Sequence, residues 1–177
     1  MYLILGPSAH ADPPGVYTER VESAREMLEA TRRHAVSADV FLATAAVSDF
    51  APARSEAHKL KRNHAGARTL DLVENPDILA RVSHMLKASR PEAVVVGFAA
   101  ETEDLALNAR EKLDRKGCDL LVANRVGPHE GFGSGKTTVE IFDALGRSER
   151  FGPSSKASVA KFILDRVAGV MNREPDQ

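Results

Sequence analysis

Residues 45–62 combine a carboxylate with a cluster of cations, and this combination suits the binding of a phosphorylated ligand. Asp49 follows a run of small residues, and Lys59, Lys61 and Arg62 come in the polar segment after it. Small residues let a backbone approach a ligand closely. A carboxylate that faces several cations suits a polyphosphate carried with a divalent metal ion. Most charge clusters are solvated surfaces, so the segment predicts either a nucleotide site or an exposed loop.

The predicted fold gives Asp49 a position at which ligands often bind. The apolar run at 40–46 lacks helical periodicity and predicts a buried strand. Buried strands are also predicted at 93–98 and 119–124, so three strand ends are expected to face one crevice. In an open parallel sheet, ligands bind at the carboxyl ends of the strands. Asp49 is therefore a candidate functional residue.

Strands and helices alternate along the chain, which predicts an α/β fold. We expect a Rossmann-like, doubly wound, mostly parallel sheet with an antiparallel hairpin at one edge. The remaining strands are predicted at 2–5, 16–21, 69–73, 138–142 and 148–151, and the helices at 23–34, 75–89, 103–116 and from 154 or 155 onward. A long polar loop is expected before residue 69. With 177 residues, the chain is predicted to form a single domain over 1–177.

Two helix starts have recognisable signals. Ser23 and Glu26 form a capping box. Asn75 is predicted to be an N-cap, with Pro76 at the first helical position, where its missing N–H costs nothing. Such a helix N-terminus can also bind an anion.

Composition argues against several classes of protein. The net charge of −1 offers no general basic field for nucleic acid. Cys118 is the single cysteine, which excludes an internal disulfide framework, and it is predicted to be a small core residue. No apolar run approaches the roughly 18 to 20 residues of a membrane span, and the first residues lack a signal peptide's basic region. We expect a soluble cytoplasmic protein that binds neither nucleic acid nor membrane.

Several motifs that suggest chemistry do not meet its requirements. The Gly-rich run at 131–137 ends in Gly-Lys-Thr, but a P-loop needs glycine where this chain has Glu130, and a strand rather than a helix is predicted next. The six histidines show no zinc-ligand spacing, and no G-x-S-x-G elbow is present. Lys112 and Lys116 lie near the C-terminus of a predicted helix, where they favour the helix dipole without any ligand.

Taken in order, these segments resemble the phosphopantothenate–cysteine ligase family, the synthetase half of the bifunctional coenzyme A biosynthesis flavoprotein of bacteria. The resemblance spans roughly residues 38–165 and is carried by AAVSDF (45–50), KLKR (59–62), NPDILA (75–80), VGFAAET (96–102), KLDRKGCDLLVAN (112–124) and GF (131–132). One such motif is weak, whereas the ordered set is specific. The family has Lys-x-Lys-Lys where this chain ends in Arg62, and the Asn usually seen after the Gly-Phe loop is missing at 135–138.

The resemblance implies a two-step ligation. A nucleoside triphosphate, CTP in the bacterial enzymes, activates the carboxylate of 4'-phosphopantothenate as an acyl-nucleotide, and the cysteine amine then displaces the nucleoside monophosphate. Lysines and Mg²⁺ would stabilise the charge that develops on the phosphates. By position, the residues that resemble nucleotide contacts are Ala45, Asp49, Lys59, Pro76, Asp77, Ile78, Leu79, Phe98, Lys112 and Lys116. Lys59 heads the motif linked to forming the acyl-nucleotide, and Asp49 is the candidate for holding Mg²⁺. The resemblance also implies a homodimer.

The chain departs from the family at its N-terminus. Family members begin with a Gly-rich strand–turn–helix whose Asn-x-Ser-Ser-Gly element is linked to the second step, and residues 1–7 here resemble the strand that follows it. We therefore expect the first unit to be absent, with full activity requiring that it be supplied elsewhere. One alternative is a non-catalytic or degenerate nucleotide-binding homologue. Another is a nicotinamide-binding domain, which the lack of a G-x-G-x-x-G motif disfavours.

Overall fold

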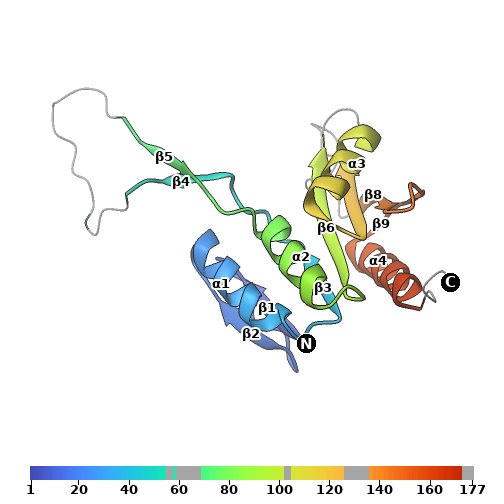
Figure 1. Ribbon diagram of the computed structural model, residues 1–177, viewed down its shortest axis with the longest axis horizontal. Coiled ribbons are helices and arrows are strands. Elements are labelled where there is room, and N and C mark those ends of the chain that lie inside the picture. Colours follow the sequence, from blue (N-terminus) through green and yellow to red (C-terminus); the bar gives the residue numbers. More distant parts are fainter. Residues whose placement is uncertain (55–57, 59–68, 102–104, 126–135, 173–177) are drawn as a thin grey trace. The chain divides into compact units, whose positions relative to one another are not determined.

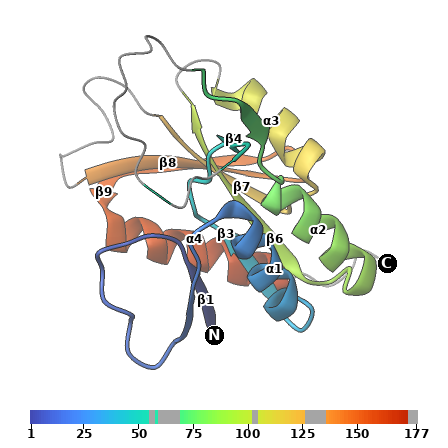
Figure 2. The same cartoon turned by 90° about the vertical axis from the view of Figure 1, so that its left-hand side faces the viewer.

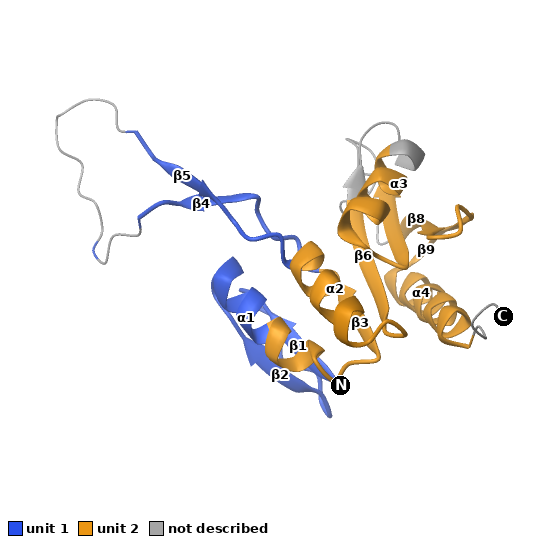
Figure 3. Ribbon diagram, in the orientation of Figure 1, with its two compact units in different colours: residues 1–30, 45–78 blue, residues 31–44, 79–177 orange. Residues whose placement is uncertain are grey.

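The computed structural model describes residues 1–54, 58, 69–101, 105–125 and 136–172 (Figure 1). The chain divides into two compact units: residues 1–30 with 45–78, and residues 31–44 with 79–177 (Figure 3). The single domain expected over 1–177 remains a prediction.

The first unit contains two small sheets. Strands β1 (Tyr2–Leu5) and β2 (Tyr17–Arg20) run parallel, with Tyr2 opposite Tyr17. Arg20 holds the segment between the two strands in place. Its guanidinium donates to the Asp12 carboxylate at 2.6 Å and to the His10 carbonyl at 2.8 Å. Strands β4 (Phe50–Pro52) and β5 (Leu72–Glu74) form an antiparallel pair.

Helix α1 (Ala24–Ala35) follows β2 and begins at the expected capping box. The Glu26 backbone N–H donates to Ser23 Oγ at 3.2 Å. In return, Glu26 Oε2 accepts from the backbone N–H groups of Glu22 (2.8 Å) and Ser23 (3.1 Å). These two backbone hydrogen bonds hold the pKa of Glu26 below its ordinary value. The local pattern alone therefore predicted this helix start correctly.

The second unit is built on a five-stranded sheet with the strand order β3-β6-β7-β8-β9. Its strands are β3 (Val40–Ala43), β6 (Val94–Glu101), β7 (Leu120–Arg125), β8 (Lys136–Asp143) and β9 (Ser148–Ser155). The first three are parallel to one another, and the last two are antiparallel to their neighbours. The predicted parallel sheet with an antiparallel edge hairpin is confirmed.

Helices cover both faces of this sheet (Figure 2). On one face lie α2 (Ile78–Ser89) and α3 (Leu105–Lys116), which pack on Val95, Leu121 and Phe142. On the other lies α4 (Lys156–Met171), capped by Ser155, whose side chains Val159, Ile163 and Val167 pack on Val94, Val96 and Ile141. This is the doubly wound arrangement that the alternation of strands and helices predicts. In the described part of the chain, none of the helices has the length and apolarity needed to cross a membrane.

The structure corrects two local predictions. The predicted polar loop contains strand β4, and its partner β5 begins at Leu72 rather than at residue 69. Helix α2 begins at Ile78, two residues after the predicted first helical position at Pro76. The physical reason is that the backbone before α2 continues the β4–β5 ladder: the Asn75 N–H donates to the Asp49 carbonyl at 2.7 Å.

Candidate functional site

The three parallel strands of the second unit end at one edge of the sheet. Ala43 in β3 is opposite Gly97 in β6, which in turn is opposite Leu121 in β7. Because the strands run in the same direction, their carboxyl ends share that edge, as predicted. Ligands of open α/β sheets bind at this edge.

Asp49 lies at the base of the β4–β5 pair. Its backbone carbonyl accepts the Asn75 N–H at 2.7 Å, and Asn75 Nδ2 donates to the neighbouring carbonyl of Ser48 at 2.9 Å. The backbone of Asp49, whose side chain is exposed, is therefore bonded to the residue that immediately precedes the predicted run at 76–79. Two segments far apart in the sequence are brought together here, and Asn75, predicted only as a helix cap, provides the bonds.

Asp49 offers a single carboxylate to a metal ion. Among the residues that the structure describes, no group of three or more His, Cys, Asp or Glu side chains could hold an ion. Mg²⁺ does not need such a group when it arrives with a nucleotide, because one or two carboxylates, waters and substrate phosphates complete its octahedron. Within the described residues, the single carboxylate of Asp49 is a donor set that would suit a metal ion carrying most of its own ligands.

The other candidate residues are distributed over several elements. Ala45 is exposed in the extended segment that follows β3, and Asp77 is exposed just before α2. Pro76, Ile78 and Leu79 are half-buried at the start of that helix. Lys59 and the rest of the cation cluster at 59–62 lie outside the described residues, as do residues 131 and 132 of the Gly-rich run.

Phe98 and the two lysines of α3 belong to the second unit. Phe98 packs partly buried against the cluster under α4. Lys112 and Lys116 lie one turn apart in the second half of α3, and Lys116 ends the helix before Gly117, whose φ of 64° allows the turn into β7. Both lysines are half-buried, and both take part in interactions. Their placement fits the helix-dipole role as well as a ligand role.

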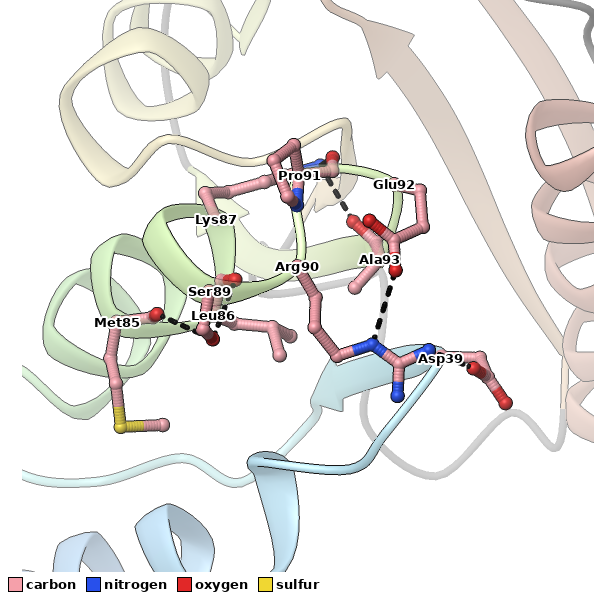
Figure 4. Close-up of polar contacts among 9 residues, drawn as sticks. All are labelled: Asp39, Met85, Leu86, Lys87, Ser89, Arg90, Pro91, Glu92 and Ala93. Atoms are coloured by element: carbon pink, nitrogen blue, oxygen red, sulfur yellow. Dashed lines mark hydrogen bonds and ion pairs between the residues drawn. The ribbon is translucent and has the colours of Figure 1, made fainter.

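A different set of charged residues forms a network of ion pairs and hydrogen bonds at the amino ends of the strands, and Figure 4 shows the part of it around Lys87, Arg90 and Asp39. Lys87, in the last turn of α2, donates to the Ala93 carbonyl at 2.6 Å and to Asp119 Oδ1 at 2.8 Å. Asp119 Oδ2 accepts the Val95 N–H at 2.7 Å, and Arg90 pairs with Asp39 at 2.6 Å. The network joins the end of α2 to the starts of β3, β6 and β7. It lies away from the carboxyl edge, so its charges are structural.

Comparison with known proteins now bears on this arrangement. Residues 1–171 match the family described as DNA/pantothenate metabolism flavoprotein C-terminal domain. The chain belongs to this family. Among curated family relatives is the coenzyme A biosynthesis bifunctional protein CoaBC of Mycolicibacterium smegmatis, which is 37% identical over 182 residues, covering 97% of this chain and 43% of that protein. The CoaBC protein of Bacillus subtilis is 38% identical over 170 residues, covering 95% of this chain and 41% of that protein.

Solved structures agree with the family assignment. The crystal structure of the C-terminal domain of a coenzyme A biosynthesis bifunctional protein CoaBC superimposes with a TM-score of 0.77 and 28% identity, over 98% of this chain and 75% of that chain. A Cab2 mutant in complex with phosphopantothenate-cysteine superimposes with a TM-score of 0.60 and 20% identity, over 88% of this chain and 54% of that chain, which shows a shared fold. The chain spans about two fifths of the length of the curated CoaBC relatives that it matches.

Proposed function

We propose that this chain carries out the phosphopantothenate–cysteine ligase step of coenzyme A biosynthesis, with CTP as the activating nucleotide. The observation that carries the proposal is the family match over 1–171, together with CoaBC relatives that are 37–38% identical over almost the whole chain. The position of Asp49 beside the start of the 76–79 run supports it, because a carboxylate and a helix N-terminus are suited to a metal-bound nucleotide.

The proposed chemistry proceeds in two displacements. A carboxylate oxygen of 4'-phosphopantothenate attacks the α-phosphorus of CTP, pyrophosphate leaves, and an acyl-cytidylate forms. The amine of cysteine then attacks the acyl carbon, loses a proton, and expels CMP to leave an amide. Negative charge develops on the α-phosphate and on pyrophosphate, so the site must supply cations. When bound with the nucleotide, Mg²⁺ would supply part of the positive charge that balances it.

We assign the proposed roles as follows. Asp49 holds the Mg²⁺ that accompanies the nucleotide, and Lys59 stabilises the transferring α-phosphate. The backbone at 77–79 offers N–H groups at the start of α2, where the helix leaves such groups without helical partners, and Pro76 contributes only its ring and carbonyl. Phe98, Lys112, Lys116 and Ala45 complete the nucleotide contacts expected from the family. The same chemistry implies a cytoplasmic location, where nucleoside triphosphates are available.

We also propose that the chain works as a homodimer. The β4–β5 pair carries Phe50, Pro52 and Leu72 on one face by strand alternation, and Phe50 and Leu72 are exposed. An isolated two-stranded ribbon is at best marginally stable in water. A second copy of the ribbon would bury these apolar side chains.

The experiment that tests the ligase proposal measures pyrophosphate and CMP together, from this chain with CTP, Mg²⁺, 4'-phosphopantothenate and cysteine. Release of both products supports a complete ligase. Pyrophosphate alone would limit the chain to the activation step. Release of neither would contradict the proposed activity, and calorimetry with CTP and Mg²⁺ would then distinguish a nucleotide-binding homologue from a chain that does not bind the nucleotide.

A further inference from the structure

Strand β6 has small side chains on the face that α2 and α3 cover. Val95, Gly97 and Ala99 alternate toward that face, whereas Val94, Val96 and Phe98 face the cluster under α4. Gly97 is buried in the middle of a strand that is hydrogen-bonded on both sides. Glycine in such a position costs conformational entropy and often marks the close approach of another segment.

The backbone conformation of Gly97 does not require glycine. The described glycines with positive φ are Gly15, Gly117, Gly146 and Gly152, and Gly97 is not among them. Space is the limiting factor instead. A Cβ at Gly97 would lie 2.8 Å from Leu79 Cδ2, 2.8 Å from Leu121 Cδ1 and 3.1 Å from Cys118 Sγ. These three atoms come from two segments, α2 and the stretch 118–121 that leads into β7, so side chains on both would have to shift to admit the methyl group.

Of these contacts, the one with Leu79 matters most for the site, because Leu79 is the second residue of α2. Its side chain packs against the same core cluster as Val95 and Leu121. A methyl group at Gly97 would displace the tip of the Leu79 side chain from this packing, and we expect the first turn of α2 to shift with it. The far end of α2 cannot follow freely, since Lys87 and Arg90 anchor it to the amino ends of the strands.

We propose that Gly97 is a positioning residue: its missing side chain seats Leu79 against β6 and thereby fixes the first turn of α2, where the proposed nucleotide-contacting run 76–79 enters the helix. The consequence for nucleotide binding rests on the proposed function. The packing of α2 against β6 is independent of the proposed function, because it follows from the contacts around Gly97 alone.

The test is Gly97→Ala in the full chain, read out by nucleotide affinity and by amide hydrogen exchange. We expect the Kd for CTP with Mg²⁺ to rise about 10- to 100-fold, because the loss of one hydrogen bond to a charged phosphate has an effect of this size. The KM for CTP should rise more than kcat falls, because the lost interaction is one of binding. Amides 81–83 of α2 should exchange faster, while those at 109–113 of α3 should not.

Two control variants separate positioning from general loss of stability. Gly169→Ala in α4 adds a methyl group where nothing lies within 4 Å, and it should change neither readout. Leu28→Ala removes a buried side chain from α1, which carries none of the proposed contacts, and it should lower stability while leaving the Kd for CTP unchanged. If Gly97→Ala does not fold, Gly97→Ala with Leu121→Val makes room on the β7 side and leaves the clash with Leu79 in place.

The outcomes distinguish the two proposals. Unchanged exchange at 81–83 in Gly97→Ala would overturn the seating of α2, whatever the nucleotide affinity. Faster exchange there with an unchanged Kd for CTP would overturn the link to nucleotide binding. If the wild-type chain does not bind CTP with Mg²⁺, the proposed function fails, and the exchange measurement still decides the role of Gly97.

Discussion

Asp49 is the residue whose backbone and side chain have separate tasks. Its carbonyl closes the β4–β5 ladder by accepting the Asn75 N–H, and its exposed carboxylate is left for solvent or a ligand. A substitution that keeps the backbone and removes only the charge therefore tests the ligand role without breaking the ladder.

We predict that Asp49→Asn lowers the affinity for CTP with Mg²⁺ at least tenfold, since even groups that only support a metal ligand contribute about 10- to 100-fold. Stability should be unchanged within about 0.5 kcal/mol, as for other exposed substitutions. Asp71→Asn is the matched control, because Asp71 is also exposed and its carbonyl also accepts a ladder bond, from Ala53 at 2.9 Å. Calorimetry at fixed Mg²⁺ makes the comparison. Equal affinities of the two variants would remove Asp49 from the site.

Helix α2 is held to the second unit's sheet at both of its ends. Its first turn packs over Gly97, and its last turn carries Lys87, whose ammonium reaches Asp119 and two backbone carbonyls. The side chains of Lys87 and Asp119 are 29% and 25% exposed. Removing one partner of a partly buried pair leaves the other short of hydrogen bonds, which costs more than losing an exposed pair.

We predict that Lys87→Met lowers the free energy of unfolding by about 1–3 kcal/mol. Lys161→Met is the matched control within α4: its pair with Asp165 is just as short, at 2.7 Å, but 77% and 62% exposed. That variant should lose at most about 0.5 kcal/mol. Urea unfolding measures both. Equal losses of unfolding free energy in the two variants would mean that partial burial does not make the Lys87–Asp119 pair stronger than an exposed pair.

The elements that the sequence predicted well have local signals. The capping box at Ser23, the turn at Gly117 and the valine-rich strand β6 are each specified by neighbouring residues. Strand β4 was missed because three residues that include Pro52 show no alternation. The N-cap prediction at Asn75 was wrong because Asn75 extends the β4–β5 ladder, with its backbone N–H on Asp49 and its side-chain amide on Ser48, and α2 begins three residues later, at Ile78.

The candidate site was predictable only in part, for the same reason. The order of motifs indicated which residues to consider, but not which of them touch. The hydrogen bond from Asn75 to Ser48 and the packing of Leu79 over Gly97 join segments that are distant along the chain. No periodicity or spacing reports such contacts. Lys87 and Asp119, 32 residues apart, could not have been paired from sequence.

At the scale of the whole molecule, the β4–β5 ribbon is the feature that bears on assembly. Phe50 is 54% exposed, and it lies on a sheet of only two strands. Within the described residues, this sheet has no hydrophobic core of its own. Single exposed apolar residues need no explanation, but several on one thin ribbon suggest a covered surface.

We predict that the wild-type chain has twice the mass of one 19.1 kDa chain in light scattering at micromolar concentration, and that Phe50→Ser shifts it toward the single-chain mass. Leu164→Ser is the matched control, since Leu164 is 55% exposed on α4 and should not affect assembly. A single-chain mass for the wild type would contradict the homodimer. A dimer that only Leu164→Ser disrupts would place the interface on α4.

The central claim is that the carboxylate of 4'-phosphopantothenate is activated by direct attack on the nucleotide. The most direct measurement uses 4'-phosphopantothenate labelled with oxygen-18 in that carboxylate, incubated with this chain, CTP, Mg²⁺ and cysteine, followed by mass spectrometry of the products. The account predicts one labelled oxygen in each CMP, because the oxygen that attacks phosphorus leaves with the nucleotide. Ligation with unlabelled CMP, or with the label in an inorganic phosphate product, would contradict it.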